Sequence, residues 1–160
     1  MRIGVVSDTH NHLVNVARIV ELLNAAKVER VVHTGDITQA KTLHALAALS
    51  APLVGVYGNN DVERESLARA SAELGFEFVE PPLRLAWAGR RIVVVHDPYD
   101  LHVHQGDAEV ALHGHNHLSV REQRNGALHF NPGECAGHLP GHNRVGVLDL
   151  VSLETELLYF

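Results

Sequence analysis

The fold of this chain is predicted from residues 3–10, which read Ile-Gly-Val-Val-Ser-Asp-Thr-His. Residues 3–6 are mostly β-branched, and the run is too short for a helix, so it predicts a buried strand. The same pattern, an apolar run that passes directly into polar residues, recurs at Val28 to Val32 and at Leu53 to Tyr57. These three segments predict neighbouring strands of one sheet.

The segments between these strands have the periodicity of amphipathic helices. One helical face is apolar in each, formed by Leu13, Val16, Ala17, Val20 and Leu23, then by Leu43, Leu46 and Ala47, and then by Leu67, Ala70 and Leu74. Alternating strands and helices form parallel sheets through right-handed crossovers. We therefore expect a βαβαβα arrangement in the N-terminal half, with helices on the outer face of the sheet.

The C-terminal half is predicted to be mostly β. Its strand-like segments, separated by turns such as Asn125-Gly126, are Phe76 to Val79, Leu83 to Trp87, Arg91 to Val95, Glu109 to Leu112, Leu128 to Phe130, Val145 to Leu150 and Glu154 to Tyr159. A chain of 160 residues suits a single domain, and no linker or repeat divides residues 1–160. The expected α/β fold therefore has two sheets packed face to face, with helices outside.

Composition argues against several functional classes. The formal net charge is -6 and basic residues form no cluster, so strong nucleic-acid binding is not expected. Apolar runs are far shorter than the roughly 20 residues of a membrane span, and we identify no signal peptide, so we expect a cytoplasmic protein without a membrane partner. The one cysteine, Cys135, excludes an internal disulfide and Cys-x-x-Cys metal sites, and is expected to be inert.

Five predicted strands pass directly into residues that can bind metal. The segments are Ser7-Asp8-Thr9-His10, Thr34-Gly35-Asp36, Gly58-Asn59-Asn60-Asp61, His96-Asp97 and His113-Gly114-His115-Asn116-His117. Sites in parallel sheets form at the carboxyl ends of strands. Each fragment alone is a weak signal, because 13 histidines produce chance matches such as Asp100-Leu101-His102, Gly106-Asp107 and His102-Val103-His104. These chance matches follow no apolar strand. The specific signal for a metal site is therefore the set of five segments, each of which directly follows a predicted strand.

Together the segments resemble the calcineurin-like metallophosphoesterases, and among them the small YfcE-type phosphodiesterases, which are related to the retromer scaffold subunit. The resemblance covers nearly the whole chain and includes Asn131-Pro132-Gly133. It implies a four-layer α-β-β-α sandwich of two mixed β-sheets flanked by helices. It also implies two divalent metal ions per chain. Mixed nitrogen and oxygen donors suit manganese, zinc or iron better than calcium or magnesium, and of these we favour manganese.

The resemblance also assigns a ligand role to seven side chains. Asp8, His10 and His117 would hold the first ion, Asn59, His96 and His115 the second, and Asp36 would bridge both. A bridging carboxylate holds two cations roughly 3.5 to 4 Å apart, and a water between them loses a proton near neutral pH. The predicted function is a metal-dependent phosphoric ester hydrolase, first of all a phosphodiesterase, in which a metal-bound hydroxide attacks phosphorus.

Three positions depart from the family pattern. Asn60 stands where the broader family has a histidine, so we expect Asn60 to contact phosphate without supplying a proton to the leaving group. Asn11 replaces a usual glycine, tolerates a left-handed backbone and is expected to face the substrate. Asp97 replaces another glycine, and could orient His96, bind metal or repel an anionic substrate.

Several residues keep more than one interpretation. Asp8 and Asp36 could instead cap helices, and Asn59 could only shape a turn. His113 is expected to contact a metal-ligating residue and not the metal itself. His138 and His142 lie in a loop that could line the site. Structural or surface roles are expected for His12, His33, His44, His102, His104 and His129.

Two other functions are open from the sequence. The retromer relative keeps this fold as a scaffold, so a weak or inactive scaffold or binding module is the main alternative, and a histidine-rich metal-storage protein is another. The presence of a coordinating residue at every ligand position favours the enzyme. We expect a small phosphate-ester substrate, with aryl phosphodiesters, cyclic nucleotides, nucleotide derivatives and protein phosphates all open, and edge strands that allow a homo-oligomer.

Overall fold

Strands and helices alternate in the N-terminal half, as the sequence predicts. The computed structural model describes residues 1–139 and 141–160. The elements in chain order are β1 (Arg2–Val6), α1 (Leu13–Ala25), β2 (Arg30–His33), α2 (Ala40–Leu46), β3 (Leu53–Val56), α3 (Arg64–Leu74), β4 (Glu77–Val79), β5 (Leu83–Trp87), β6 (Arg90–Val94), a 3₁₀ turn (Pro98–Asp100), α4 (Leu101–His104), β7 (Val110–Leu112), β8 (Val120–Arg124), β9 (Ala127–Asn131), β10 (Arg144–Asp149) and β11 (Thr155–Tyr159). In these described ranges, no helix has the length and apolar character needed to cross a membrane.

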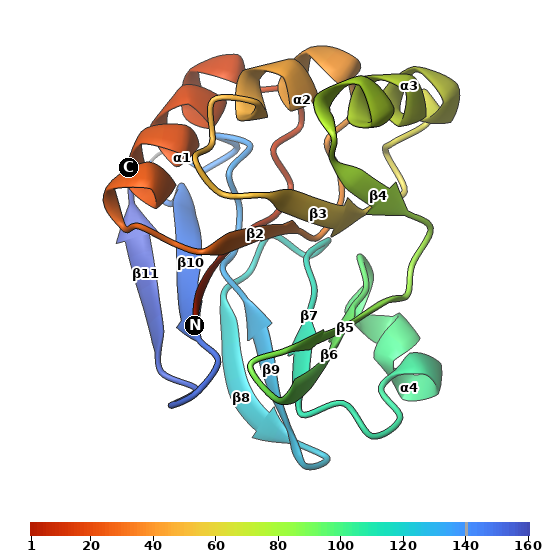
Figure 1. Cartoon of the computed structure of the whole chain (residues 1–160), viewed down its shortest axis with the longest axis vertical. Coiled ribbons are helices and arrows are strands. Elements are labelled where there is room, and N and C mark those ends of the chain that lie inside the picture. The colour runs from red at the N-terminus through yellow and green to blue at the C-terminus, as the bar shows by residue number, and fades with distance from the viewer. Residues whose placement is uncertain (140) are drawn as a thin grey trace.

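The first sheet has six strands in the order β11-β10-β1-β2-β3-β4 (Figure 1). Strands β1 to β4 are parallel neighbours, with Val5 beside Val32 and Val32 beside Val54, whereas β10 and β11 run antiparallel to their neighbours. The carboxyl ends of β1, β2 and β3 therefore lie at the same edge of this sheet.

The second sheet has five strands in the order β5-β6-β7-β9-β8. Its three central strands are parallel, with Val93 beside Ala111 and Ala111 beside His129, and the edge strands β5 and β8 are antiparallel. Both sheets are thus mixed, and the ends of β6 and β7 point the same way.

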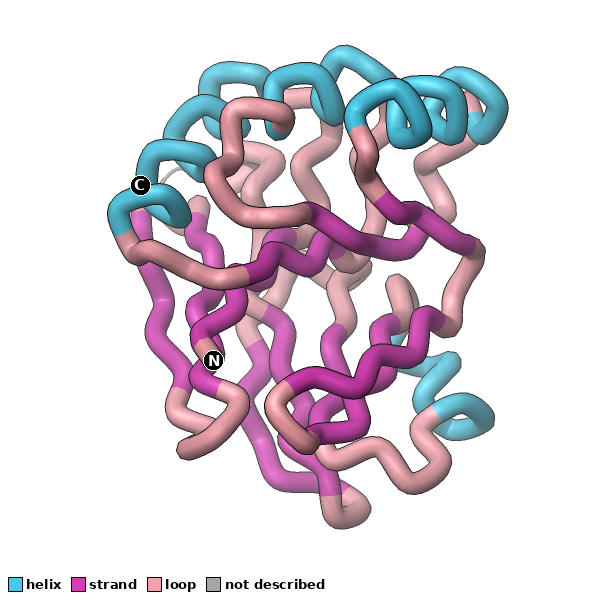
Figure 2. Tube along the Cα trace, in the orientation of Figure 1, coloured by secondary structure: helices cyan, strands magenta, loops and turns pink. Residues whose placement is uncertain are grey.

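The helices and the two sheets form four layers, and a hydrophobic cluster lies between each pair of adjacent layers. Helices α1, α2 and α3 pack on the outer face of the first sheet, and a second cluster that includes Ile3 and Phe130 fills the space between the sheets. Figure 2 shows these three helices along one side of the molecule, in cyan. The outer face of the second sheet is covered by a thinner layer, in which Leu101 of α4 packs with Val93 and Ala111. The four-layer α-β-β-α sandwich of two mixed sheets is therefore confirmed.

Two parts of the chain differ from the sequence prediction. Strand β8 was not predicted because its residues after Val120 are Arg, Glu, Gln and Arg, all exposed, which removes the apolar alternation of a strand. No helix or strand was predicted for residues 98–104, but they form the 3₁₀ turn and α4, whose only buried residue is Leu101. One buried side chain is too weak a periodic signal to predict a helix.

Helix α1 offers a direct test of the packing between the helical layer and the first sheet. Leu23 is fully buried against β1, where a Cβ added at Gly4 would lie 2.9 Å from Leu23 Cδ2. We expect Leu23→Ala to lower the free energy of unfolding by about 2–5 kcal/mol, because it leaves a cavity in tightly packed surroundings.

The matched control is Val14→Ala, at an exposed position of the same helix. It is expected to change stability by less than about 0.5 kcal/mol. Urea denaturation followed by circular dichroism measures both values, and equal losses in the two variants would contradict this packing.

Candidate metal centre

Five strand ends bring the seven predicted ligand residues to one edge shared by both sheets. Strand β1 passes into Asp8 and His10, β2 into Asp36, β3 into Asn59, β6 into His96, and β7 into His115 and His117. The backbone is left-handed at five of these positions, with φ between 40° and 73°, namely Asp8, His10, Asp36, His115 and His117. Strain of about 1–3 kcal/mol at each such residue is tolerated mainly where function needs the conformation.

Two glycines let the loops approach each other closely at this edge. A Cβ at Gly58 would lie 2.5 Å from the backbone nitrogen of Asp36, and a Cβ at Gly114 would lie 2.8 Å from Asp8 Oδ2. No side chain fits at either position. The glycines of the Gly-Asn and Gly-His segments therefore allow the direct packing of these loops against the two carboxylates.

The first group consists of Asp8, His10 and His117. Asp8 Oδ1 lies 3.9 Å from His10 Nε2 and 3.5 Å from His117 Nε2. Both Asp8 Oδ1 and His10 Nε2 are buried and have no hydrogen-bond partner. Burial lowers the pKa of His10 and so favours a neutral ring with a free lone pair. Burial also raises the pKa of Asp8, and the hydrogen bond from Ser7 and the nearby rings of His96 and His117 offset this effect only in part.

The second group consists of Asn59, His96 and His115. Asn59 Oδ1 lies 2.9 Å from His96 Nε2 and 3.0 Å from His115 Nδ1, and the two ring nitrogens are 3.2 Å apart. Nδ1 of His96 is 2.9 Å from the carbonyl oxygen of Thr34, which can only accept, so this nitrogen carries the proton. The Nε2 lone pair of a neutral His96 ring is then directed at the oxygen and nitrogen atoms of its neighbours.

Asp36 lies between the two groups. Its Oδ2 is 3.4 Å from His10 Nε2 and 3.5 Å from His96 Nε2, so one carboxylate oxygen faces a residue of each group. Burial alone would raise the pKa of Asp36, but hydrogen bonds from a protonated His96 ring and from Asn60 outweigh burial and hold the pKa below its ordinary value. For His96, burial opposes the charged ring, but the neighbouring Asp36 outweighs burial and raises the His96 pKa. The surroundings of Asp36 therefore favour a positively charged group beside its carboxylate.

The structure also shows the surroundings of Asn60 and Asn11. The backbone N–H of Asn60 donates to Asp36 Oδ1 over 2.9 Å, and its side-chain amide donates to Asp36 Oδ2 over 2.7 Å. Asn11 has a φ of 60° and accepts a hydrogen bond from Thr42 Oγ1. The predicted phosphate contacts of both asparagines stay predictions, whereas the contact of Asn60 with Asp36 was not anticipated.

Asp97 lies at a cleft of about 250 Å³ that borders Asn59, His96 and His115. Its Oδ2 is 4.0 Å from His115 Nε2, and its Oδ1 accepts a hydrogen bond from the backbone of Tyr99. Asp97 thus approaches His115 and begins the 3₁₀ turn. The same cleft is lined by Tyr57, Arg64, Glu80, Pro81 and Asp100.

The capping roles considered for Asp8 and Asp36 are wrong. Helix α1 is capped by His12, whose side chain accepts a hydrogen bond from Asn15, and α2 has Gln39 at its N-cap position. The left-handed backbone of both aspartates differs from the extended conformation of most N-cap residues. Their carboxylates are therefore free to face the centre of the site.

Two buried carboxylates near the site received no role of their own in the sequence analysis. Asp61 accepts hydrogen bonds from the backbone of Gly58, Asp36 and Thr38, at 2.7, 2.9 and 2.6 Å, and so ties the loops after β2 and β3 together. Glu134 directly follows Asn131-Pro132-Gly133, and its Oε2 lies 3.0 Å from His117 Nδ1. An acidic residue beside a recognised motif was the only sequence signal for Glu134.

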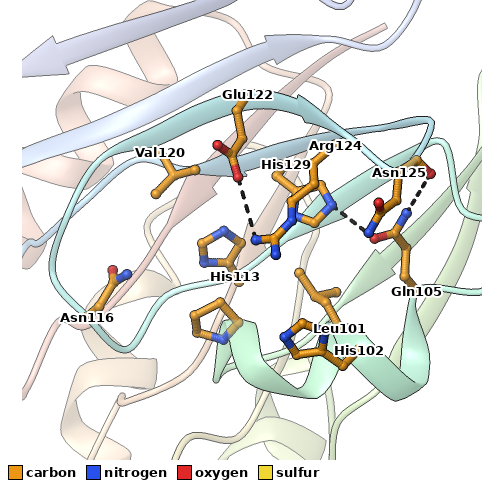
Figure 3. Close-up of a pocket in the computed structure, with 11 residues that line it drawn as sticks. Leu101, His102, Gln105, His113, Asn116, Val120, Glu122, Arg124, Asn125 and His129 are labelled. Atoms are coloured by element: carbon orange, nitrogen blue, oxygen red, sulfur yellow. Dashed lines mark hydrogen bonds and ion pairs between the residues drawn. The ribbon is translucent and has the colours of Figure 1, made fainter.

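Two further histidines differ in where they lie relative to this site. His138, considered as lining the site, is stacked on His117 with ring centroids 5.0 Å apart and lies 5.4 Å from the ring of His10. His113 lies instead beside a cavity of about 230 Å³, where its buried Nδ1 has no partner (Figure 3). Burial lowers the pKa of His113 to about 4, so its ring is neutral.

The cavity of Figure 3 is a separate feature. It is lined by Pro98, Leu101, His102, Gln105, His113, Asn116, Val120, Glu122, Arg124, Asn125 and His129, which include none of the seven predicted ligands. His113 and Asn116 face it from the same loop whose His115 and His117 face the predicted metal centre. Neighbouring residues of this loop thus border the cavity and the predicted metal centre.

Cys135 is inert, as expected. The thiol is fully buried, burial raises its pKa to about 12, and Sγ lies 3.1 Å from the carbonyl oxygen of Arg144, to which it donates. The reactive thiolate is therefore suppressed at neutral pH.

Comparison with known proteins identifies relatives over nearly the whole chain. The chain is 32% identical over 154 residues to phosphodiesterase MJ0936 of Methanocaldococcus jannaschii, covering 93% of each protein. It is 28% identical to phosphodiesterase YfcE of Escherichia coli K12, covering 85% of this chain and 80% of the relative.

Solved structures show the same fold. A structure described as a novel archaeal phosphodiesterase superposes with a TM-score of 0.91 at 30% identity over 100% of both chains. Vps29 of Entamoeba histolytica in complex with zinc superposes with a TM-score of 0.67 at 17% identity, over 100% of this chain and 98% of that one, and shares the fold alone.

The family profile described as the calcineurin-like phosphoesterase superfamily domain matches residues 1–153. With this match, the two-sheet sandwich and a relative at 32% identity, the chain belongs to the calcineurin-like phosphoesterase superfamily.

Proposed function

We propose that this chain is a phosphodiesterase that works with two divalent cations. In this proposal, Asp8, His10 and His117 hold one cation, Asn59, His96 and His115 hold the other, and Asp36 contacts both. Membership of a phosphoesterase superfamily makes the chain a hydrolase of phosphate esters, and relatives named phosphodiesterases support the diester class.

The position of Asp36 carries the proposal. One of its carboxylate oxygens lies within 3.5 Å of a ring nitrogen from each group, and the side chain is almost fully buried. Asp8 Oδ1 and His10 Nε2 are buried without partners, a cost of about 1–3 kcal/mol for each group unless another species completes their coordination. Carboxylate oxygens and imidazole nitrogens that converge in this way fit a cation.

The donor set favours borderline divalent metals. Imidazole, amide and carboxylate ligands suit manganese, zinc and iron better than calcium or magnesium, and among these we favour manganese. When bound, a pair of such cations activates a water molecule for attack on phosphorus and neutralises charge on the phosphoryl oxygens. The chain itself holds the ligands, excludes bulk water from Asp8 and Asp36, and keeps Asp36 ionised through Asn60.

A scaffold function is the second candidate, because Vps29 structures share the fold. Similarity of this kind, below 25% identity, does not indicate what this chain does. The complete set of seven coordinating side chains, brought together at one edge, favours the hydrolase. A scaffold has no need of buried, unpartnered Asp8 Oδ1 and His10 Nε2 atoms.

Removal of the shared carboxylate tests the proposal. Wild-type protein, freed of metal with a chelator and reloaded with manganese, is expected to retain about two ions per chain and to hydrolyse bis(p-nitrophenyl) phosphate. Asp36→Ala is expected to lose manganese and to reduce hydrolysis to the background of the assay, because both cations lose a ligand.

The matched control is Asp107→Ala. Asp107 belongs to the chance Gly-Asp match at residues 106–107, its side chain is 80% exposed, and it pairs with Arg91 at the surface. This control should keep wild-type metal content and rate. Full activity in Asp36→Ala, with metal content measured by plasma mass spectrometry, would refute the proposed centre.

The absence of an acid at position 60 predicts dependence on the leaving group. The Asn60 amide cannot release a proton, so an alkyl phosphodiester should react at least about 10²-fold more slowly than an aryl one, beyond the difference in their uncatalysed rates. Asn60→His should reduce this excess, because imidazole can protonate an alkoxide.

Initial rates on aryl and dialkyl phosphodiesters, measured with and without enzyme at equal manganese, provide the comparison. If the wild-type protein accelerates both substrates equally, a group other than residue 60 protonates the leaving group, and the prediction is wrong.

A further inference from the structure

Glu134 is a buried carboxylate that the proposed metal site does not use. Its side chain is only 1% exposed, in the loop between β9 and β10. Burial of a carboxylate is costly unless hydrogen bonds or charges compensate it. The contacts of Glu134 therefore indicate why an acidic residue is tolerated at this place.

The two carboxylate oxygens have different partners. Oε1 accepts a hydrogen bond from the backbone N–H of Leu139 over 2.7 Å, which ties the following loop to the site. Oε2 lies 3.0 Å from Nδ1 of His117, and Nδ1 of the more exposed His138 is further away, at 3.6 Å. The shortest side-chain contact of Glu134 is thus with a predicted metal ligand.

The orientation of His117 makes this contact specific. Its Nδ1 faces Glu134, and its Nε2 faces Asp8 Oδ1 at 3.5 Å, so the two ring nitrogens point to different partners. A neutral imidazole has one N–H and one lone pair. A carboxylate accepts the N–H, and the lone pair of Nε2 is then directed toward Asp8 and His10.

We propose that Glu134 is a positioning residue that fixes the His117 ring and its Nδ1–H tautomer, so that Nε2 is presented as a ligand to the cation held with Asp8 and His10. This inference rests on the proposed function. Carboxylates that accept the second N–H of a metal-bound histidine raise ligand basicity and fix ring orientation, and their loss commonly costs 10- to 100-fold in metal affinity.

A separate cation between His117, Glu134 and His138 is the competing interpretation, because these three side chains also lie close enough to hold a metal. It would require the lone pair of His117 at Nδ1, which would place the N–H on Nε2, against Asp8 and His10. One neutral ring cannot serve both sites, and the tautomer of His117 therefore distinguishes them.

The test uses Glu134→Gln and Glu134→Ala, with Glu109→Gln as a control. Glu109 is a partly buried glutamate that pairs with Arg90 and Arg91, and it has no contact with the predicted ligands. Glutamine keeps the size of Glu134, but its single amide oxygen can serve His117 or Leu139, not both. Alanine removes both acceptors.

Calorimetric titration of metal-free protein with manganese is the first measurement. We expect one of two binding events to weaken by about 10- to 100-fold in Glu134→Ala and by less in Glu134→Gln, with the other event unchanged. Glu109→Gln should match the wild type. Thermal unfolding of the metal-free variants separates this effect from a general loss of stability, which would lower the melting temperature without selecting one site.

Nitrogen-15 NMR of the imidazole rings in metal-free protein is the second measurement. The wild-type His117 ring is expected as the Nδ1–H tautomer, and the Glu134 variants are expected to gain the Nε2–H form. Unchanged affinities and tautomer in folded Glu134→Gln and Glu134→Ala, while the wild type binds two ions, would overturn this inference alone. A wild type that binds no second ion would instead overturn the proposed function, and an Nε2–H wild type would favour the separate cation.

Discussion

The concentration of buried negative charge around Asp36 is the constraint on which the site depends. Asp8, Asp36, Asp61 and Glu134 are all buried at this edge, and in residues 1–139 and 141–160 the ion-pair partners of Asp8 and Asp36 are histidines. Buried carboxylates are stable only when donors or cations compensate the loss of water. Asp61 receives three backbone N–H groups and Asp36 receives two donors from Asn60, but Asp8 is left with an unpartnered oxygen. Divalent cations would supply the missing positive charge.

The two sheets contribute different chemistry to this edge. The ends of the first sheet provide all three predicted oxygen ligands, Asp8, Asp36 and Asn59, together with His10, and the second sheet provides the imidazoles of His96, His115 and His117. The hydrophobic cluster between the sheets includes the buried residues Ile3, Leu112 and Phe130 and packs the two sheets against each other. Because a tightly packed interior resists small displacements, the core between the sheets helps to fix the separation of the predicted ligand residues.

The fold alone does not decide between an enzyme and a scaffold. Vps29 shares the architecture at 17% identity, and this similarity extends to the fold alone. Two residues outside the predicted ligand set, Asn60 and Glu134, contact predicted ligands. Asn60 donates to Asp36 through an amide that cannot release a proton, and Glu134 contacts His117 from a loop outside both sheets. Function therefore depends on individual side chains placed on a widely used framework.

The sequence by itself determined the strand and helix order, the two-sheet architecture and the residue types gathered at the strand ends. It could do so because short β-branched runs and helical periodicity are local patterns, and because residues that directly follow parallel strands meet at one edge. Only the tertiary structure decided the edge strand β8, the helix α4, the ties made by Asp61 and the contact between Glu134 and His117. Strand β8 is exposed and polar after Val120, and α4 buries one residue, so neither has a periodic signal. The roles of Asp61 and Glu134 arise from contacts between separate loops, and such contacts depend on how the two sheets pack.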